Sequence, residues 1–268
     1  MARAGGENFP VASRILGPRL REPLLAIYGF ARLVDQVGDE VEGDRPALLD
    51  WLDSEIEGIY DGRVPEHPVL RRMAATAHDH GIPAEPLHRL VEANRRDQTV
   101  RSYATFDDLL GYCALSADPV GRMVLHVFGA ATANRMALSD AVCSGLQVTE
   151  HLQDVREDLG RGRVYLPQED LARFGCEEGD LAISPTPERV RALVAFEVER
   201  ARALLDRGAP LISTLHGRTR LAVTAFVAGG RSALDAIERA GFALGDSPPG
   251  ATRLARLAAF LRTARRAR

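Results

Sequence analysis

Apolar residues along this chain recur mainly with the three-to-four-residue period of an α-helix, and alternating strand patterns are scarce. Proline and glycine interrupt the helical pattern, for example at Gly81 and Pro83 and across residues 247–250. No internal repeat or low-complexity linker divides the chain. We therefore expect an all-α fold in a single domain spanning residues 1–268. The expected helices cover residues 18–40, 46–60, 67–80, 84–95, 106–115, 117–135, 138–160, 168–174, 187–207, 217–241 and 250–267.

Two pairs of aspartates stand four residues apart within these helices, Asp35 with Asp39 and Asp154 with Asp158. Residues four apart lie on one helix face, about one turn or ~5.4 Å apart. Such a pair is often only part of a solvated face, but the apolar run PLLAIYGFARLV before the first pair argues against that interpretation. Mg²⁺ prefers oxygen ligands and is typically held by one or two carboxylates plus substrate phosphates. The pairs therefore predict a Mg²⁺-dependent diphosphate site.

The segment around the second pair adds groups that suit both metal and phosphate. Glu150 precedes Asp154 by one helical turn, and Glu157 adjoins Asp158. Arginine is the side chain best suited to bidentate phosphate contacts. Acid for metal and guanidinium for phosphate thus occur in one segment, whose arginines are Arg156, Arg161 and Arg163.

The order of these motifs resembles the squalene/phytoene synthase family of head-to-head isoprenoid synthases over nearly the whole chain. The segments that carry the resemblance are ENFPVASRIL, AIYGFARLVDQVGDE, DDLLGYCALSADPVGRMVLHVFG and LQVTEHLQDVREDLGRGRVYLP. The resemblance implies the helical isoprenoid-synthase fold with a central cavity. Gln36 departs from the usual Asp-Asp-x-x-Asp pattern, and Glu150 stands where the family commonly has Asn. Both outer aspartate pairs persist, so we expect a working site.

Within the family, ENFPVAS, CALSADPVGR and YLPQEDLARFG resemble the hopanoid-pathway subgroup. That subgroup is implied to convert presqualene diphosphate and water to hydroxysqualene and diphosphate, with Mg²⁺ as cofactor. One alternative is the condensation of two prenyl diphosphates to presqualene diphosphate, phytoene or dehydrosqualene. A second is a non-catalytic assembly factor of the same fold, in which the acidic motifs are expected to be eroded. A third is a plain helical interaction module.

The resemblance also implies substrate-binding residues outside the acidic pairs. Tyr28 and Arg32 precede Asp35 by seven and three residues, roughly on its helix face. Ordinary structural roles, such as a core anchor for Phe9 or a solvated face for the glutamines, are the alternative interpretation. His151 is expected to be structural. The predicted catalytic residues are Asp35, Asp39, Asp154 and Asp158, the metal ligands are these four with Glu150 and Glu157, and the substrate-binding residues are Asn8, Phe9, Tyr28, Arg32, Gln147, Gln153, Arg161 and Arg231.

Composition excludes several classes of protein. The net charge of −3 provides no general basic field for nucleic acid. All 34 basic residues are arginine, so lysine Schiff-base chemistry is impossible. The three cysteines are scattered, which argues against a disulfide framework or structural zinc and favours the cytoplasm. The N-terminus has no apolar signal region, and no run reaches the ~18 apolar residues of a membrane span.

The C-terminal segment ATRLARLAAFLRTARRAR has the pattern of a basic amphipathic helix. Its apolar residues can contact the anionic inner face of a membrane, or they can pack on the domain. The low water solubility of a C30 isoprenoid product favours membrane contact. Neighbouring squalene-pathway enzymes are further expected partners. The apolar residues are Leu254, Leu257, Phe260 and Leu261.

Overall fold

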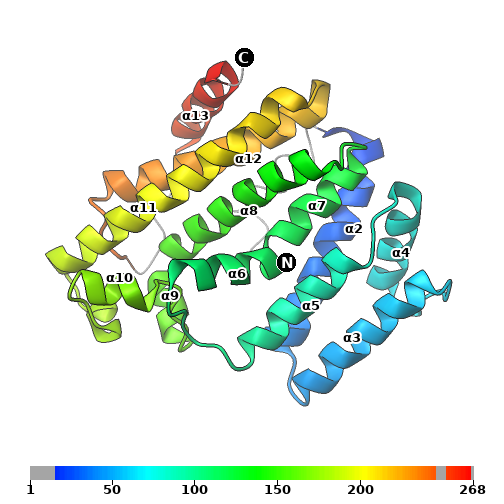
Figure 1. The fold of residues 1–268 in the computed structure, drawn as a ribbon, viewed down its shortest axis with the longest axis horizontal. Helices are drawn as coiled ribbons and strands as arrows, with labels where there is room; N and C mark the ends of the chain where they lie inside the picture. Colours follow the sequence, from blue (N-terminus) through cyan, green and yellow to red (C-terminus); the bar gives the residue numbers. More distant parts are fainter. Residues whose placement is uncertain (1–15, 246–251, 267–268) are drawn as a thin grey trace.

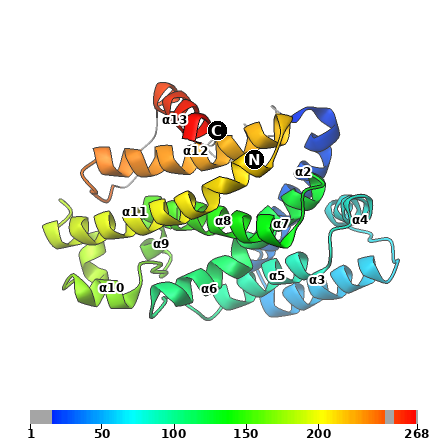
Figure 2. The same cartoon turned by 45° about the horizontal axis from the view of Figure 1, so that its top comes forward.

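The computed structural model of the chain describes residues 16–245 and 252–266, and it consists of α-helices packed against one another (Figures 1 and 2). Within these two ranges there is no strand, only an isolated bridge between Ser102 and Val164. The predicted all-α class is confirmed. The helices are α2 (Pro18–Asp35), α3 (Arg45–Tyr60), α4 (Pro68–His80), α5 (Glu85–Asp97), α6 (Phe106–Ser116), α7 (Asp118–Val127), α8 (Ala133–Gln153), α9 (Val155–Gly160), α10 (Gln168–Arg173), α11 (Glu188–Gly208), α12 (Gly217–Arg239) and α13 (Arg253–Arg266).

Several helices begin where the sequence supplies a capping side chain. The Asp44 side chain accepts a hydrogen bond from the backbone N–H of Ala47 (3.0 Å) at the start of α3. Thr105 accepts one from the N–H of Asp108 (3.1 Å), and the Asp108 carboxylate bonds back to the N–H of Thr105 (3.0 Å). These bonds satisfy backbone donors that have no partner inside a helix. They explain why the predicted starts near residues 46 and 106 lie close to the observed ones.

The sequence prediction is wrong about where the helices around α7 and α8 end and begin. We predicted helices over 117–135 and 138–160, but α7 ends at Val127 and α8 already begins at Ala133. Gly129 adopts φ +63, a left-handed conformation that glycine reaches without a Cβ penalty, and it stops α7. Thr132 then caps α8 by accepting a hydrogen bond from the N–H of Arg135 (3.4 Å). Two short 3₁₀ segments, Glu178–Ala182 and Ala209–Thr214, were also not predicted.

The buried apolar side chains form two cores that meet at α7. The N-terminal core draws mainly on α2, α3, α4 and α5 and includes Ile27, Phe30, Leu49 and Met73. The C-terminal core draws mainly on α6, α8, α11 and α12 and includes Leu193, Leu205 and Val227. Within α7, Met123 belongs to the first core and Leu125 to the second. Figure 1 shows the corresponding halves, with α3 and α4 at one end and α10 and α11 at the other.

Among residues 16–245 and 252–266, no helix combines the length and the apolar composition that crossing a bilayer requires.

Candidate active site

The first acidic motif lies where α2 changes into a π-turn. Asp35 is the last residue of α2, and Asp39 lies within the π-turn Gln36–Glu40, which is closed by a hydrogen bond from the N–H of Val41 to the carbonyl oxygen of Gln36 (3.0 Å). The prediction of one continuous α-helix over 18–40 is therefore wrong in its last turn. π-turns occur frequently at functional sites.

The π-turn packs closely against α5, and Gly38 makes that approach possible. A Cβ atom at Gly38 would lie 2.0 Å from Oδ1 of Asn94, so only glycine fits without displacing that side chain. The Asn94 side chain hydrogen-bonds to the Asp35 carboxylate. Gln98, the residue that follows α5, donates from Nε2 to the carbonyl oxygen of Gly38 (3.0 Å). The position of the first motif is thus set by contacts with α5.

Asp35 is surrounded by protein, although its side chain still reaches solvent. Partial burial raises the pKa of its carboxyl to about 6, and the negative charges of Asp39 and Asp97 act in the same direction. The hydrogen bond from Asn94 and the positive charge of Arg32 oppose this rise without cancelling it. A carboxylate in this environment gains from the arrival of a cation.

The second acidic motif lies at a break between two helices. Asp154 has φ −107 and ψ 13, and it separates the end of α8 from the start of α9. The predicted continuous helix over 138–160 is therefore wrong at this residue. Asp158 follows on α9 with 14% of its side chain exposed. Its Oδ2 atom is buried without a hydrogen bond from any residue that the structure describes, and Nδ1 of His151 lies 3.8 Å away.

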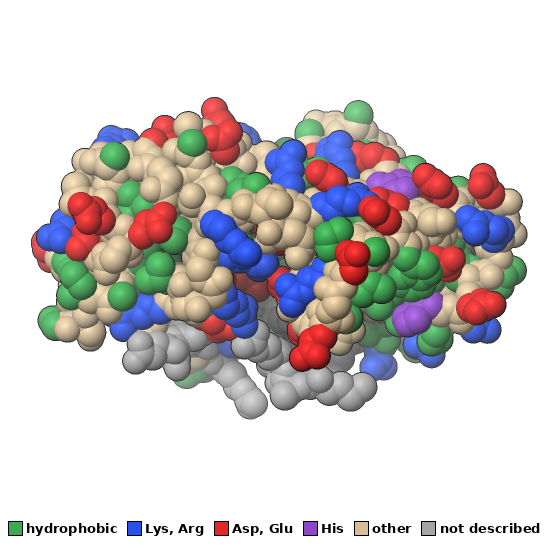
Figure 3. Space-filling view, turned by 90° about the horizontal axis from the view of Figure 1, so that it is seen from below, with side chains coloured by type: hydrophobic (Ala, Val, Ile, Leu, Met, Phe, Trp, Pro, Cys, Tyr) green, Lys and Arg blue, Asp and Glu red, His purple; other side chains and the backbone are tan. Residues whose placement is uncertain are grey.

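Arg163 joins the two motifs across 124 residues of sequence. Its Nη2 donates a hydrogen bond to Oδ1 of Asp39 (2.7 Å), and its side chain is only 14% exposed. Burial disfavours the charged guanidinium, but the hydrogen bond to Asp39 and the negative charges of Asp97 and Asp39 outweigh that effect and raise the pKa of Arg163. The fold therefore brings the first motif beside the loop that follows the second. Figure 3 shows acidic side chains set between arginine side chains near the middle of one face of the molecule.

Asp97 is a site residue that our sequence interpretation missed. It lies at the end of α5, is 8% exposed, and accepts a hydrogen bond at Oδ2 from the hydroxyl of Tyr112 (2.8 Å). Burial raises the pKa of its carboxyl, whereas Tyr112 and Arg163 oppose the rise. A signal was present in the sequence: Asn94 and Asp97 continue the stripe of Leu87, Leu90 and Val91 on α5, so two polar residues occupy core positions of an amphipathic helix.

Aromatic rings line the same region. Tyr165 stacks on the imidazole ring of His151, with ring centroids 3.7 Å apart and planes 11° apart. The ring centroid of Tyr112 lies 5.8 Å from that of Tyr165 and 5.4 Å from that of Tyr103. Burial raises the pKa of Tyr103, Tyr112 and Tyr165, so their hydroxyls stay neutral over the whole physiological range. His151, which we expected to be structural, thus contacts both the aromatic group and the second motif.

Three predicted substrate-binding residues lie near the motifs. Arg32 is on α2 and donates from Nη2 to Oε1 of Glu40 in the π-turn (2.6 Å). Tyr28, one turn earlier on α2, is half-buried. Gln147 on α8 lies with its Nε2 3.2 Å from Nε2 of His151. These three side chains stand on the two helices that lead into the acidic motifs.

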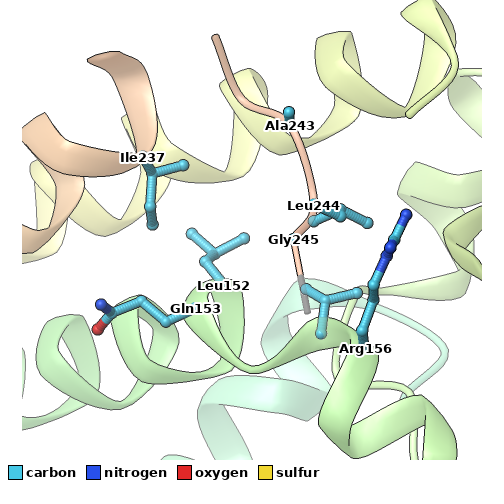
Figure 4. A pocket seen from close by; sticks show the side chains of 8 residues that line it. Leu152, Gln153, Arg156, Ile237, Ala243, Leu244 and Gly245 are labelled. Carbon is cyan, nitrogen blue, oxygen red and sulfur yellow. The ribbon is translucent and has the colours of Figure 1, made fainter. Parts of the chain in front are cut away.

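The other predicted residues lie farther out. Arg161 and Glu157 pair with each other at 2.7 Å, each about half exposed, and Glu150 is exposed on α8. Arg231 bonds to Asp206 of α11 and to Thr263 of α13, so it connects three helices. Gln153 lines a small pocket beyond the end of α8, with Leu152, Arg156, Ile237 and Leu244 (Figure 4). Asn8 and Phe9 lie outside the described residues.

The carboxylates suit a divalent cation that is held jointly with a ligand. In the part of the chain that the structure describes, no three carboxylate, imidazole or thiol groups lie close enough to form an ion site on their own. Mg²⁺ usually takes one or two carboxylates and completes its shell with water and phosphate oxygens. The buried Oδ2 of Asp158 and the crowded carboxyl of Asp35 fit such a shared site, because a cation would give the first oxygen a partner and would offset the burial and the negative neighbours of the second.

Comparison with known proteins gives a consistent set of relatives. The squalene/phytoene synthase family matches residues 2–258. A hydroxysqualene synthase of Rhodopseudomonas palustris is 39% identical over 214 residues, which cover 78% of this chain and 71% of the relative. One from Zymomonas mobilis is 36% identical, covering 79% and 72%. A phytoene synthase of Arthrospira platensis is 31% identical, covering 87% and 80%.

Two solved structures have the same arrangement of helices. The squalene synthase HpnC from Alicyclobacillus acidocaldarius superposes with a TM-score of 0.85 at 41% identity and covers 91% of this chain and 92% of that one. A dehydrosqualene synthase in complex with a ligand superposes with a TM-score of 0.88 at 23% identity, covering 98% and 92%. The second similarity concerns the fold alone. Together they confirm the predicted isoprenoid-synthase helical fold.

Proposed function

The chain belongs to the squalene/phytoene synthase family of isoprenoid synthases, and from this premise we propose that it converts presqualene diphosphate and water to hydroxysqualene and diphosphate. The 36–39% identity to hydroxysqualene synthases over more than three quarters of the chain supports this reaction. The observation that carries the proposal is the hydrogen bond from Arg163, in the loop that follows the second acidic motif, to Asp39 of the first, because it supports a site to which both motifs contribute.

Asp35 and Asp39 from the first motif, with Asp154 and Asp158 from the second, are the proposed Mg²⁺ ligands. When bound, Mg²⁺ supplies the positive charge that stabilises the departing diphosphate. Glu150 and Glu157 complete the proposed set of ligands, and Glu157 would have to leave its pair with Arg161 to bind the ion. This assignment agrees with the unpaired oxygen of Asp158 and with the raised pKa of Asp35.

Arginines near the motifs would bind the phosphate oxygens. Arg32 is 44% exposed and pairs with Glu40, and Arg163 pairs with Asp39. Each guanidinium could release its carboxylate and bind a diphosphate oxygen close to its present position. Tyr28, Gln147 and the N-terminal Asn8 and Phe9 remain proposed substrate contacts. Gln153, Arg161 and Arg231 have weaker support, because Gln153 lines a separate small pocket, Arg161 pairs with Glu157, and Arg231 bonds to Asp206 and Thr263.

In the proposed reaction, the carbon–oxygen bond to diphosphate breaks and its electron pair leaves with the diphosphate. Water then attacks the carbocation and loses a proton, which gives the alcohol. The faces of Tyr103, Tyr112 and Tyr165 provide a neutral, electron-rich wall that can stabilise the cation and limit access of bulk water. Asp97, bonded to the Tyr112 hydroxyl, is a buried carboxylate able to receive the released proton.

A second candidate is the condensation of two prenyl diphosphates. Phytoene synthases that are 28–31% identical over 87% of this chain support it. The same carboxylates and arginines would serve that chemistry, since its first step is also loss of diphosphate.

Labelled water separates the two reactions. The purified protein is incubated with Mg²⁺ and either presqualene diphosphate or farnesyl diphosphate in ¹⁸O-water, without a nicotinamide cofactor. We expect presqualene diphosphate to give a C30 alcohol that carries ¹⁸O. Consumption of farnesyl diphosphate alone, with a product that keeps its diphosphate, would establish condensation instead. Release of no diphosphate from either substrate would favour the assembly-factor alternative.

The proposal also places the reaction in the cytoplasm, on the inner face of the membrane. Enzymes that supply presqualene diphosphate and consume a C30 alcohol are the proposed neighbours, because both compounds are poorly soluble in water.

A further inference from the structure

Helix α13 (Arg253–Arg266) lies along α12 (Gly217–Arg239) at the edge of the molecule (Figures 1 and 2). Its packed face contains Ala259 and Thr263, each 2% exposed. Thr263 accepts a hydrogen bond from Nη1 of Arg231 (3.1 Å), and Arg262 pairs with Asp235 of α12 (2.9 Å). These contacts fix which side of α13 faces the protein.

The three leucines of α13 lie on the opposite side. Leu254, Leu257 and Leu261 recur at spacings of three and four residues, so they share one face. They are 79%, 56% and 49% exposed. The alternative in which the apolar stripe packs on the domain therefore does not hold for these residues. Three exposed leucines in a row on one helix face are typical of a contact surface.

Arginines accompany this leucine face. Between residues 253 and 266 the helix has no acidic residue, and Arg256, Arg262, Arg265 and Arg266 are exposed. Asp235, the acidic neighbour on α12, is already paired with Arg202 at 2.8 Å and with Arg262. The surface around the leucines is thus apolar at its centre and positive beside it. A second copy of the chain would bring two positive faces together, whereas an anionic lipid surface complements both properties.

We propose that α13 is a membrane-docking helix, in which Leu254, Leu257 and Leu261 insert among the lipids while Arg265, one turn after Leu261 on the same side, contacts anionic headgroups and Arg266 adds positive charge at the end of the helix. The protein binds the bilayer from one side, and the leucine face points away from α12. This surface is separate from the acidic motifs, so docking requires no substrate and holds for either candidate reaction. Docking would let a water-insoluble product pass directly into the bilayer.

Vesicle co-sedimentation tests the proposal on the full-length protein without substrate. We expect binding to vesicles that contain phosphatidylglycerol, weaker binding when salt is added, and little binding to phosphatidylcholine alone. Replacing Leu254, Leu257 and Leu261 together by Ser should reduce binding by about a hundredfold. Replacing Arg265 and Arg266 by Gln should reduce it by about tenfold, mainly at low salt.

Matched controls change the same residue types elsewhere. Val64→Ser alters an apolar side chain that is 78% exposed between α3 and α4. Arg72→Gln combined with Arg207→Gln removes two exposed arginines outside α13. Both control proteins should bind vesicles as the unchanged protein does. Circular dichroism and the melting temperature establish that all variants are folded.

A tryptophan placed on the leucine face reports insertion directly. The chain has one tryptophan, Trp51, so Leu257→Trp in a Trp51→Phe background gives a single reporter. Its emission should shift to the blue with anionic vesicles. Equal vesicle binding by the unchanged protein and the triple-leucine variant, or no blue shift, would overturn the proposal. So would a lipid-free dimer that the leucine substitutions dissociate, because the face would then be a self-association surface.

Discussion

The two acidic motifs have the same spacing in sequence but different surroundings in the fold. The first motif lies on the N-terminal core, where the π-turn is held against α5 and Asp39 is already paired with Arg163. The second lies on the C-terminal core, at a break between α8 and α9, and Oδ2 of Asp158 is buried without a hydrogen bond. One motif thus has a cation from the chain itself, and the other has an oxygen that receives no hydrogen bond from residues 16–245 or 252–266.

This difference indicates how the site accommodates its charge without a ligand. Arg163 follows the second motif in sequence, yet its guanidinium neutralises the first. The pairing links the two cores and lowers the repulsion among Asp35, Asp39 and Asp97. In the second motif, Oδ2 of Asp158 is the oxygen that an added cation would satisfy.

Loss of one carboxylate from either motif is expected to have the largest effect. Asp35→Asn and Asp154→Asn should each lower turnover by about 10²- to 10³-fold, the range found when one group that stabilises transition-state charge is removed. The far-UV circular dichroism should stay unchanged. Diphosphate release measures the effect. Asp107→Asn, at an exposed position of α6, is the control. Equal turnover by the unchanged protein and either variant would contradict the assignment of that motif.

Gly38→Ala tests the packing that distinguishes the first motif. The new Cβ would meet Asn94 at 2.0 Å, so Asn94 must move away from Asp35. Overpacking of this kind typically costs about 2 kcal/mol of unfolding free energy. The matched control is Gly111→Ala in α6, where nothing lies within 4 Å and a helix-favouring side chain should stabilise by roughly 0.5–1 kcal/mol. Urea unfolding compares them, and similar results for both would show that the approach to Asn94 is not tight.

Arg163→Gln tests the link between the motifs. Asp39 would lose its partner and Asp97 a nearby positive charge, so we expect a loss of about 1–2 kcal/mol in the unfolding free energy. Arg161→Gln, two residues away, breaks only an exposed pair with Glu157 and should cost at most about 0.5 kcal/mol. If the two variants lose equal stability, the link between the cores is not energetically significant.

The raised pKa of Asp35 predicts a small dependence of stability on pH. Its carboxyl has a pKa of about 6 in the folded, metal-free protein and about 4 in the unfolded chain. The folded state therefore binds the proton more tightly, and the contribution of Asp35 to stability falls as pH rises from about 4 to about 6. The unfolding free energy of Asp35→Asn should rise relative to that of the unchanged protein through this interval, by roughly 1 kcal/mol in total. The full pKa shift would give more, but the side chain reaches solvent, which weakens the effect.

The measurement is urea unfolding without metal at several pH values. Glu57→Gln, on an exposed face of α3, is the control and should show no such trend. An advantage of Asp35→Asn that does not change with pH would contradict the raised pKa.

Local sequence patterns were sufficient for most of the fold. Helical periodicity, with capping residues such as Asp44 and Thr105, predicted nearly all helices to within a few residues. The break at Asp154 was missed because no proline or glycine marks it, and the apolar period continues through it. The end of α7 at Val127, just before Gly129, was missed because a glycine inside a helical pattern is often tolerated.

The candidate site was predictable only in part, because some of its contacts join residues that are far apart in the sequence. The acidic pairs are local patterns, so they could be recognised from sequence. The contact of Arg163 with Asp39 spans 124 residues and depends on how the two cores meet. Asp97 is a single acid whose importance comes from Tyr112 and from burial, although its core position on α5 was a usable signal.

The π-turn at Gln36–Glu40 makes this stretch of chain sensitive to its length as well as to the glycine at position 38. Gln36 is exposed, so many side chains can occupy that position. Deleting any one residue between Asp35 and Asp39 would restore an ordinary α-helical turn and rotate Asp39 by about 100° around the helix axis, away from Arg163. Descendants of this gene can therefore exchange Gln36 freely, but the turn can neither gain nor lose a residue, and an alignment gap inside it would mark a relative with different chemistry.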